Sequence, residues 1–146
     1  MKHTPLKPGT TGLTRKAPLK PGTKRLKSGR STGTPTKAEA ARIVESKLGP
    51  CMACEIWHRL FDRRCDAEGC DYNHCKSGNI RRGHLAGYAL CAYHHRAVPL
   101  DGHTSATMRL NFGPSLMDGS RLFRDTYGSD QELIDLQTDI IQRGNA

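Results

Sequence analysis

The first 36 residues contain no aspartate or glutamate, although they carry nine lysines and arginines. Residues 37–146 carry 14 basic and 14 acidic side chains, so the whole net charge of +9 resides in the N-terminal segment. Net charge does not determine a fold. An acid-free cationic segment is nevertheless typical of chains that bind an anionic polymer.

Long apolar runs and aromatic side chains are also scarce. No stretch approaches the ~18–20 apolar residues that a membrane-spanning helix needs, so we expect no membrane partner. The N-terminal segment lacks an apolar region of the signal-peptide type, which favours a reducing, cytoplasmic location. With three phenylalanines and one tryptophan in 146 residues, the apolar core is small and needs additional support.

The N-terminal segment repeats the hexapeptide Pro-Leu-Lys-Pro-Gly-Thr at residues 5–10 and 18–23. Such a composition buries too little apolar surface to fold. We therefore predict a disordered arm over residues 1–35 and a folded domain over residues 36–146. We interpret the arm as a tether for nucleic-acid phosphates rather than a solubilising linker. Its phosphate-binding residues would be Lys7, Arg15, Lys16, Lys20, Lys24, Arg25, Lys27 and Arg30.

Helix signals lie on both sides of a cysteine- and histidine-rich centre. Capping-box patterns at Thr36 and Ser129 each open an amphipathic helix, and Gly49-Pro50 ends the first of them. Two further helices are predicted over residues 104–110 and 120–127, where Gly-Pro and Gly follow the periodic segments.

Six cysteines in a reducing compartment are expected to bind metal rather than form disulfides. Two residues separate Cys51 from Cys54 and Cys91 from His94, and two such pairs complete a tetrahedral site for structural Zn²⁺. A redox role for the first pair would leave the second pair unexplained. In a small core this ion would supply much of the folding free energy.

Three other cysteines, Cys65, Cys70 and Cys75, lie five residues apart. Their spacing is not diagnostic. Together with His58 they form a set of ligands for a second zinc, or Cys65 and Cys70 simply pack in the core. Both interpretations remain open at this stage.

The segment from Tyr72 to Leu100 contains four lysines and arginines, four histidines and no carboxylate. Its pattern predicts a strand, a polar loop, a return strand at residues 88–90, the second cysteine–histidine pair and a helix. His74 and His95 then lie at the two ends of one ββα unit. Imidazoles among cations suit phosphodiester hydrolysis, which needs a base for water and a divalent cation for the phosphate. The loop cations Lys76, Arg81 and Arg82 are interpreted as phosphate contacts.

Asn73-His74, Gly83-His84 and Cys91-x2-His94-His95, preceded by Cys51-x2-Cys54, resemble an HNH (ββα-metal) endonuclease. The resemblance is closest to the phage-borne, Ref-like recombination-enhancement nucleases that act with RecA filaments, and it covers residues 35–142. It implies an α+β fold with a small, zinc-stapled ββα-metal core and flanking helices. It also implies a DNA endonuclease with catalytic Mg²⁺ or Mn²⁺ that acts in phage recombination in the host cytoplasm, in dependence on a RecA–DNA filament. We expect a monomer.

The resemblance also implies roles for single residues. His74 matches the general base, and His95 matches the metal-binding histidine at the start of the helix. Asn73 stands where such enzymes carry an aspartate or histidine ligand, and His103 matches a later histidine that completes the cation site. His84 is expected to orient the base or to contact phosphate, and it counts with His74 and His95 as a candidate catalytic residue.

A second hypothesis is a non-catalytic, zinc-stabilised DNA-binding adaptor. The neutral amide of Asn73 supports it, because an amide oxygen binds a cation more weakly than a carboxylate does. A third, a zinc-dependent protein-interaction domain, predicts a DNA affinity that does not respond to salt. Nicking of supercoiled DNA by the wild-type chain but not by His74→Ala would separate the first hypothesis from the second.

Overall fold

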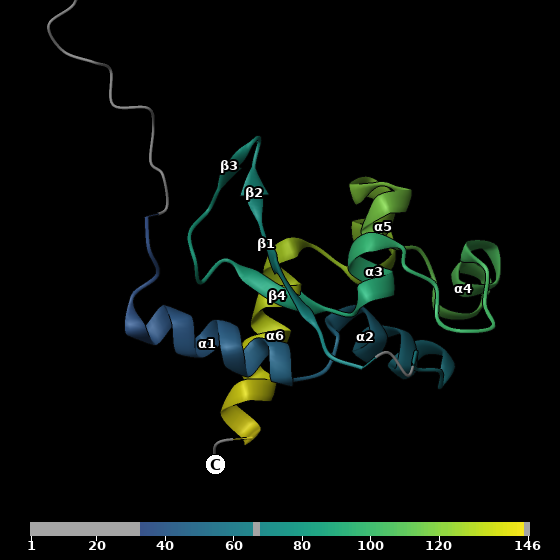
Figure 1. The fold of residues 1–146 in the computed structure, drawn as a ribbon, viewed down its shortest axis with the longest axis horizontal. Coiled ribbons are helices and arrows are strands. Elements are labelled where there is room, and N and C mark those ends of the chain that lie inside the picture. The colour runs from purple at the N-terminus through teal and green to yellow at the C-terminus, as the bar shows by residue number, and fades with distance from the viewer. Residues whose placement is uncertain (1–32, 66–67, 145–146) are drawn as a thin grey trace, which may run out of the picture. The chain divides into compact units, whose positions relative to one another are not determined.

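The computed structural model describes residues 33–65 and 68–144. Residues 1–32 of the predicted N-terminal arm, with its eight phosphate-binding candidates, lie outside the described residues. The helices of the described part are α1 (Lys37–Leu48), α2 (Met52–Phe61), α3 (Ala92–Arg96), α4 (Ser105–Phe112), the 3₁₀ turn η1 (Leu116–Asp118), α5 (Ser120–Tyr127) and α6 (Asp130–Gly144). Figure 1 traces their order along the chain.

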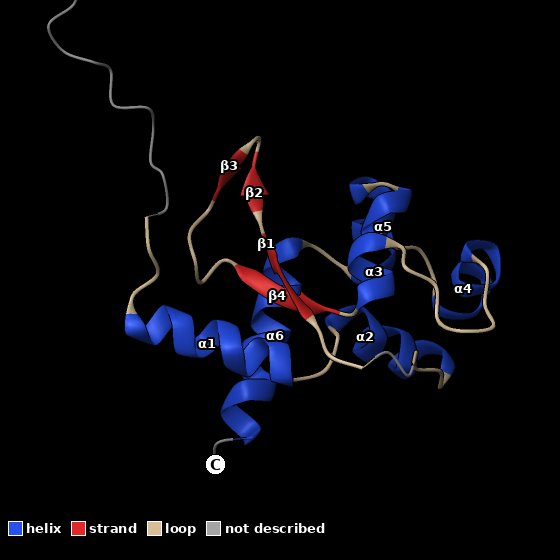
Figure 2. Cartoon of the chain, in the orientation of Figure 1, coloured by secondary structure: helices blue, strands red, loops and turns tan. Residues whose placement is uncertain are grey.

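The strands form two short antiparallel sheets, drawn in red in Figure 2. β1 (Asp71–His74) pairs with β4 (Gly87–Leu90), which confirms the predicted return strand. β2 (Lys76–Ser77) and β3 (Ile80–Arg81) form a second hairpin that extends from the end of β1, in the segment predicted to be a loop. The fold is therefore α+β, as predicted, with two small sheets rather than one.

The central pair of strands is covered by helices. Helices α1, α2, α3 and α6 all contact β4, and α1 and α6 also contact each other. Tyr88 and Leu90 of β4 are fully buried, and Met52, Phe123 and Leu133 bring apolar side chains to them from α2, α5 and α6. Strand β4 is thus the centre of a small apolar core, and the strand that carries His74 lies next to it.

The predicted capping boxes are present. The Thr36 hydroxyl accepts from the Glu39 amide at 3.3 Å, and the Glu39 carboxylate accepts from the Thr36 amide at 2.7 Å. Ser129 and Glu132 repeat the arrangement at the start of α6, where the Ser129 amide donates to the carboxylate at 2.7 Å. The two short helices predicted before α6 are confirmed as α4, which begins after its cap Thr104, and α5.

Helix α2 has no counterpart among the predictions, because Cys51 and Cys54 were interpreted only as a pair of zinc ligands. Cys51 precedes the helix without forming a side-chain cap, so no polar capping signal marks its start. Its buried residues are Met52, Ala53 and Cys54, all in the first turn. Among residues 33–65 and 68–144, no helix has the length and apolar character needed to cross a bilayer.

Candidate functional site

The four residues predicted to bind structural zinc come together in the core. Cys51 and Cys54 flank the start of α2, and Cys91 and His94 flank the start of α3. Their candidate ligand atoms all lie within 4.8 Å of one another, and all four residues are buried. We call this group the cysteine clip. It can hold a metal ion such as Zn²⁺.

The orientation of His94 tests whether the clip suits zinc. Its Nδ1 atom lies 3.6, 3.4 and 3.2 Å from the sulfurs of Cys51, Cys54 and Cys91, close to the ~3.5 Å that a tetrahedral zinc imposes between nitrogen and sulfur ligands. Its Nε2 atom lies 3.0 Å from the carbonyl oxygen of Phe112. A carbonyl only accepts, so Nε2 carries the proton and the Nδ1 lone pair faces the sulfurs. The donor set therefore fits a structural zinc.

The thiols of the clip differ in their tendency to ionise. Hydrogen bonds from Cys51, Cys54 and Cys65 hold the pKa of Cys91 well below its usual range. Burial raises the pKa of Cys51, and a hydrogen bond with Cys51 raises that of Cys54. Cys91 thus ionises more readily than Cys51 and Cys54, whose thiols must lose their protons when a metal binds.

The remaining cysteines do not gather into a second site. Among the described residues, the clip is the one group of three or more such donors close enough to share an ion. Cys65 instead joins the clip, because its sulfur lies 2.9 Å from that of Cys54 and 3.3 Å from that of Cys91. Cys70 is half-buried, and Cys75 is buried at the end of β1.

His74, the predicted base, ends β1 with its ring 5.0 Å from Tyr72 and 6.0 Å from His84, measured between centroids. Its Nδ1 atom is buried and has no hydrogen-bond partner among the described residues. Burial, together with the charges of Arg81 and His84, lowers the pKa of His74 below 6.5. The imidazole is consequently neutral near pH 7, the form in which it can accept a proton.

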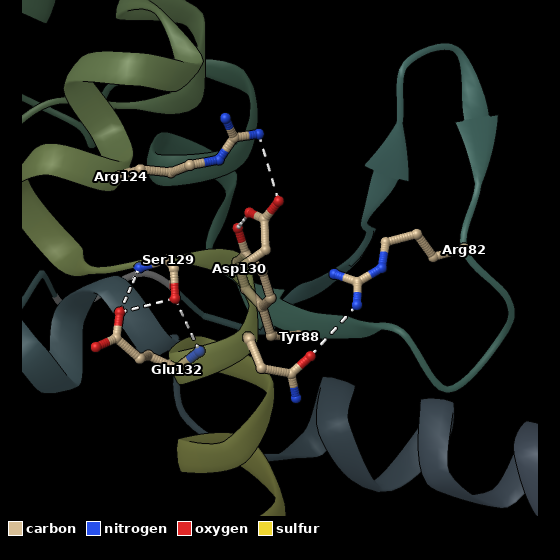
Figure 3. A network of polar contacts seen from close by, with 7 residues as sticks. Arg82, Tyr88, Arg124, Ser129, Asp130 and Glu132 are labelled. Atoms are coloured by element: carbon tan, nitrogen blue, oxygen red, sulfur yellow. Dashed lines mark hydrogen bonds and ion pairs between the residues drawn. The ribbon is translucent and has the colours of Figure 1, made fainter.

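A hollow of about 460 Å³ opens beside this end of β1. His74 and Lys76 line it from the strand side, and Arg124 and Asp130 line it from α5 and the start of α6. Figure 3 shows Asp130 between two partners: its carboxylate accepts from the Tyr88 hydroxyl at 3.2 Å and pairs with Arg124 at 3.3 Å. Lys76 and Arg124 together outweigh the one carboxylate on the walls of this hollow, and the resulting positive charge suits a phosphate group.

His95 has a partner that the sequence analysis missed. Its Nδ1 atom lies 3.2 Å from the Asp71 carboxylate, which also pairs with Arg96 at 3.0 Å. The hydrogen bond from His95 is the main cause of the lowered pKa of Asp71. Strand alternation was the available signal, because Asp71 lies two residues before Asn73 and therefore on the same face of the strand.

The structure does not bring all of the predicted site residues into contact with one another. No hydrogen bond or ring contact joins His74 to His95 within residues 33–65 and 68–144. His103 is exposed, with its ring 6.0 Å from Phe112, and no contact within the same residues brings it to His95. The Asn73 side chain hydrogen-bonds Tyr88, directly opposite in β4, and it helps to line the hollow.

The predicted phosphate contacts of the core lie on the surface, since Lys76, Arg81 and Arg82 are all exposed. Figure 3 shows Arg82 reaching toward the first turn of α6, where its guanidinium donates to Gln131 at 3.4 Å. His84 is buried, and its Nε2 atom lies 3.1 Å from the Gly33 carbonyl. The first described residues of the chain thus contact the histidine beside His74.

A cysteine clip that can hold a metal ion, next to a hairpin and helix that carry further histidines, defines a small α+β domain. The family model for recombination enhancement, RecA-dependent nucleases matches residues 35–142. The chain belongs to this family, and is thus a nuclease of recombination that works in the context of DNA and RecA. No curated protein and no solved structure matches the chain.

Proposed function

We propose that this RecA-dependent nuclease is a metal-dependent DNA endonuclease of the HNH type, with His74 as its general base. The observation that carries the proposal is the buried Nδ1 atom of a neutral imidazole that has no partner in the described part of the chain. A buried polar atom without a partner costs about 1–3 kcal/mol. Such a cost is typical of a site whose partner arrives with the substrate.

The surroundings of His74 support this role. β-sheet pairing with Gly87 fixes its backbone, and the edge-on ring of Tyr72 restricts its side chain. A water molecule placed in the adjacent hollow can donate a proton to the imidazole while Lys76 and Arg124 attract the phosphate. The lowered pKa keeps His74 ready to accept that proton at neutral pH.

The proposed residues for a divalent cation are Asp71 and His95, with Asn73 as a further oxygen donor on the same face of β1. When bound, the cation would stabilise negative charge on the phosphate and the leaving oxygen. A carboxylate and an imidazole fit it, since Mn²⁺ accepts both donor types and Mg²⁺ prefers the oxygens. Asp71 supplies the charge that the amide of Asn73 lacks, which weakens the main argument for a non-catalytic adaptor.

The DNA-binding part of the proposal combines the hairpin and the N-terminal arm. Lys76, Arg81 and Arg82 project from the segment that follows His74, so they would hold the phosphates next to the reacting one. Deleting residues 1–32 should weaken DNA binding and flatten its dependence on salt, because fewer counterions are then released. An affinity and salt slope equal to those of the full chain would remove the arm from the proposal.

The proposed reaction is tested by nicking of supercoiled plasmid in the presence of RecA, single-stranded DNA, and Mg²⁺ or Mn²⁺. We expect His74→Gln to slow nicking by about 10²–10⁴-fold, the usual contribution of a general base. Asp71→Asn should slow it as well, with a raised requirement for the cation. The matched control is His58→Gln, which changes a half-buried histidine of α2 whose Nδ1 atom lies 3.3 Å from the Asp62 carboxylate.

DNA binding and zinc content should be the same in all four proteins. If the wild type and His74→Gln nick equally poorly with each cation, with and without RecA, the enzyme proposal fails and the adaptor hypothesis takes its place. If His74→Gln alone is inactive while Asp71→Asn keeps full rate, the base is retained and the cation assignment is wrong.

A further inference from the structure

Together with Cys65, the four residues of the cysteine clip make five neighbouring donors, one more than a tetrahedral zinc accepts. The Cys65 sulfur contacts the sulfurs of Cys54 and Cys91 at 2.9 and 3.3 Å. His94 contacts the same two sulfurs through Nδ1, at 3.4 and 3.2 Å. Cys65 and His94 therefore compete for one position beside the Cys54–Cys91 edge.

The two competitors differ in their access to solvent. A cleft of about 380 Å³ reaches the clip, and it is lined by the cysteines Cys51, Cys54, Cys65, Cys70 and Cys91. His94 is absent from its lining and fully buried, held on the inner side by the Phe112 carbonyl at 3.0 Å and the Tyr127 hydroxyl at 3.1 Å. An ion that arrives through the cleft consequently meets cysteine side chains, Cys65 among them, before it meets the imidazole.

We propose that Cys65 is a fifth metal donor, which binds the incoming ion together with Cys54 and Cys91 and replaces His94 when that imidazole is absent. The ligand class is a soft divalent ion such as Zn²⁺, because thiolates favour such ions. An alternative is that Cys65 is only a small apolar side chain, as buried cysteines often are. Packing alone predicts no effect of Cys65 on the metal.

The equilibrium test uses Co²⁺ as the probe and the full chain under reducing conditions. Tetrahedral Co²⁺ shows a sulfur-to-metal charge-transfer band whose intensity grows with the number of bound thiolates. His94→Ala should keep the ion with the intensity of four thiolates instead of three. Adding Cys65→Ala to that variant should weaken binding by more than about 100-fold, beyond what the loss of a supporting contact costs.

The matched control is His94→Ala combined with Cys70→Ala, which removes a half-buried cysteine from the same cleft. This protein should bind Co²⁺ as His94→Ala does. The proposal is overturned if the Cys65 and Cys70 double variants bind equally well, or if His94→Ala shows only three thiolates.

His94 also supports the fold through its bonds to Phe112 and Tyr127, so a kinetic test keeps that histidine. Excess Cd²⁺ replaces Zn²⁺ in a thiolate site, and its ultraviolet charge-transfer band reports the exchange. Cys65→Ala in the zinc-loaded chain should slow the exchange by about 10-fold or more, whereas Cys70→Ala should leave it unchanged. Equal rates for the two variants and the wild type would falsify the role of Cys65 as the first donor.

Discussion

The cysteine clip and the histidine-bearing end of β1 lie in the same small domain but are built in opposite ways. In the clip, four donors lie close enough to share one ion, and Cys65 lies beside them as a fifth. The Nε2 atom of His94 is fixed by a backbone carbonyl. At the end of β1, the Nδ1 atom of His74 is buried and has no hydrogen-bond partner within the described part of the chain. One region has surplus partners for an ion, and the other lacks a partner for a reacting atom.

The difference separates stability from reactivity. A buried donor set that is complete on its own can hold an ion permanently and contribute to folding. A buried imidazole nitrogen without a partner costs folding free energy, but its lone pair is not already engaged by another group. Substitutions in the first region should therefore alter the fold, and substitutions in the second should alter the rate.

The largest effect is expected from Cys91→Ser. This change removes the sulfur that lies nearest to His94 and that ionises most readily. Structural zinc supplies about 10–16 kcal/mol in small domains, comparable with the whole stability of a domain. Circular dichroism should show loss of the folded state, and elemental analysis loss of zinc. His74→Gln should keep both, and unfolding of that variant would break the comparison.

Gly87→Ala should have a smaller effect, which lowers both the stability of the fold and the rate of nicking. A methyl group at this position would lie 2.5 Å from the Asn73 carbonyl oxygen and 2.6 Å from the Tyr72 ring. Either the β1–β4 pairing or the ring beside His74 must move, at a cost of about 1–3 kcal/mol. Thermal unfolding and nicking should both decline while zinc content stays constant. Gly144→Ala, which meets open space, should change none of the three.

The two capping boxes allow a finer comparison. Ser129→Ala and Thr36→Ala should each cost about 1 kcal/mol in thermal or denaturant unfolding. Ser129 precedes Asp130, which lines the hollow beside His74, whereas Thr36 caps α1 and does not line the hollow. Only Ser129→Ala should therefore slow nicking at temperatures where both proteins are folded. Equal rates would show that the start of α6 tolerates movement without consequence for the site.

The smallest expected effect is a shift of the pH profile. Because the charge of Arg81 helps to lower the pKa of His74, Arg81→Gln should raise that pKa toward 6.5. The protonated form of His74 then persists to higher pH, so the acidic limb of the pH–rate profile for nicking moves to higher pH. Arg82→Gln removes a neighbouring charge that does not shift the pKa of His74, and it should leave the limb in place. If the acidic limb lies at the same pH in both variants, the pKa seen in the pH–rate profile does not belong to His74.

Local signals predicted much of this fold. The capping boxes at Thr36 and Ser129 depend on residues three apart, and the structure contains both. The β2–β3 hairpin was missed because each strand has two exposed residues, too few to show alternation. Helix α2 was missed because its start carries cysteines that serve the clip rather than a polar cap.

The site was harder to predict, because its partners come from distant parts of the chain. The residues of the clip were identified from their spacing, yet Cys65 enters the same cluster from a loop that follows α2. The segment from Tyr72 to Leu100 contains no carboxylate, but Asp71 and Asp130 bring two to it from outside. Strand alternation places Asp71 on the same face as Asn73, but its pairing with His95 depends on how α3 packs on β1, which the local pattern does not reveal.

The amide of Gln137 in α6 has a consequence for the two-stranded sheet. Gln137 is fully buried, and its side-chain oxygen accepts from the backbone N–H of Ala89 in β4 at 3.0 Å. An unpaired N–H on an outer strand normally offers a template for a strand of another molecule. Here a side chain of the same molecule occupies that position, so the N–H of Ala89 is not available to pair with a strand of another molecule.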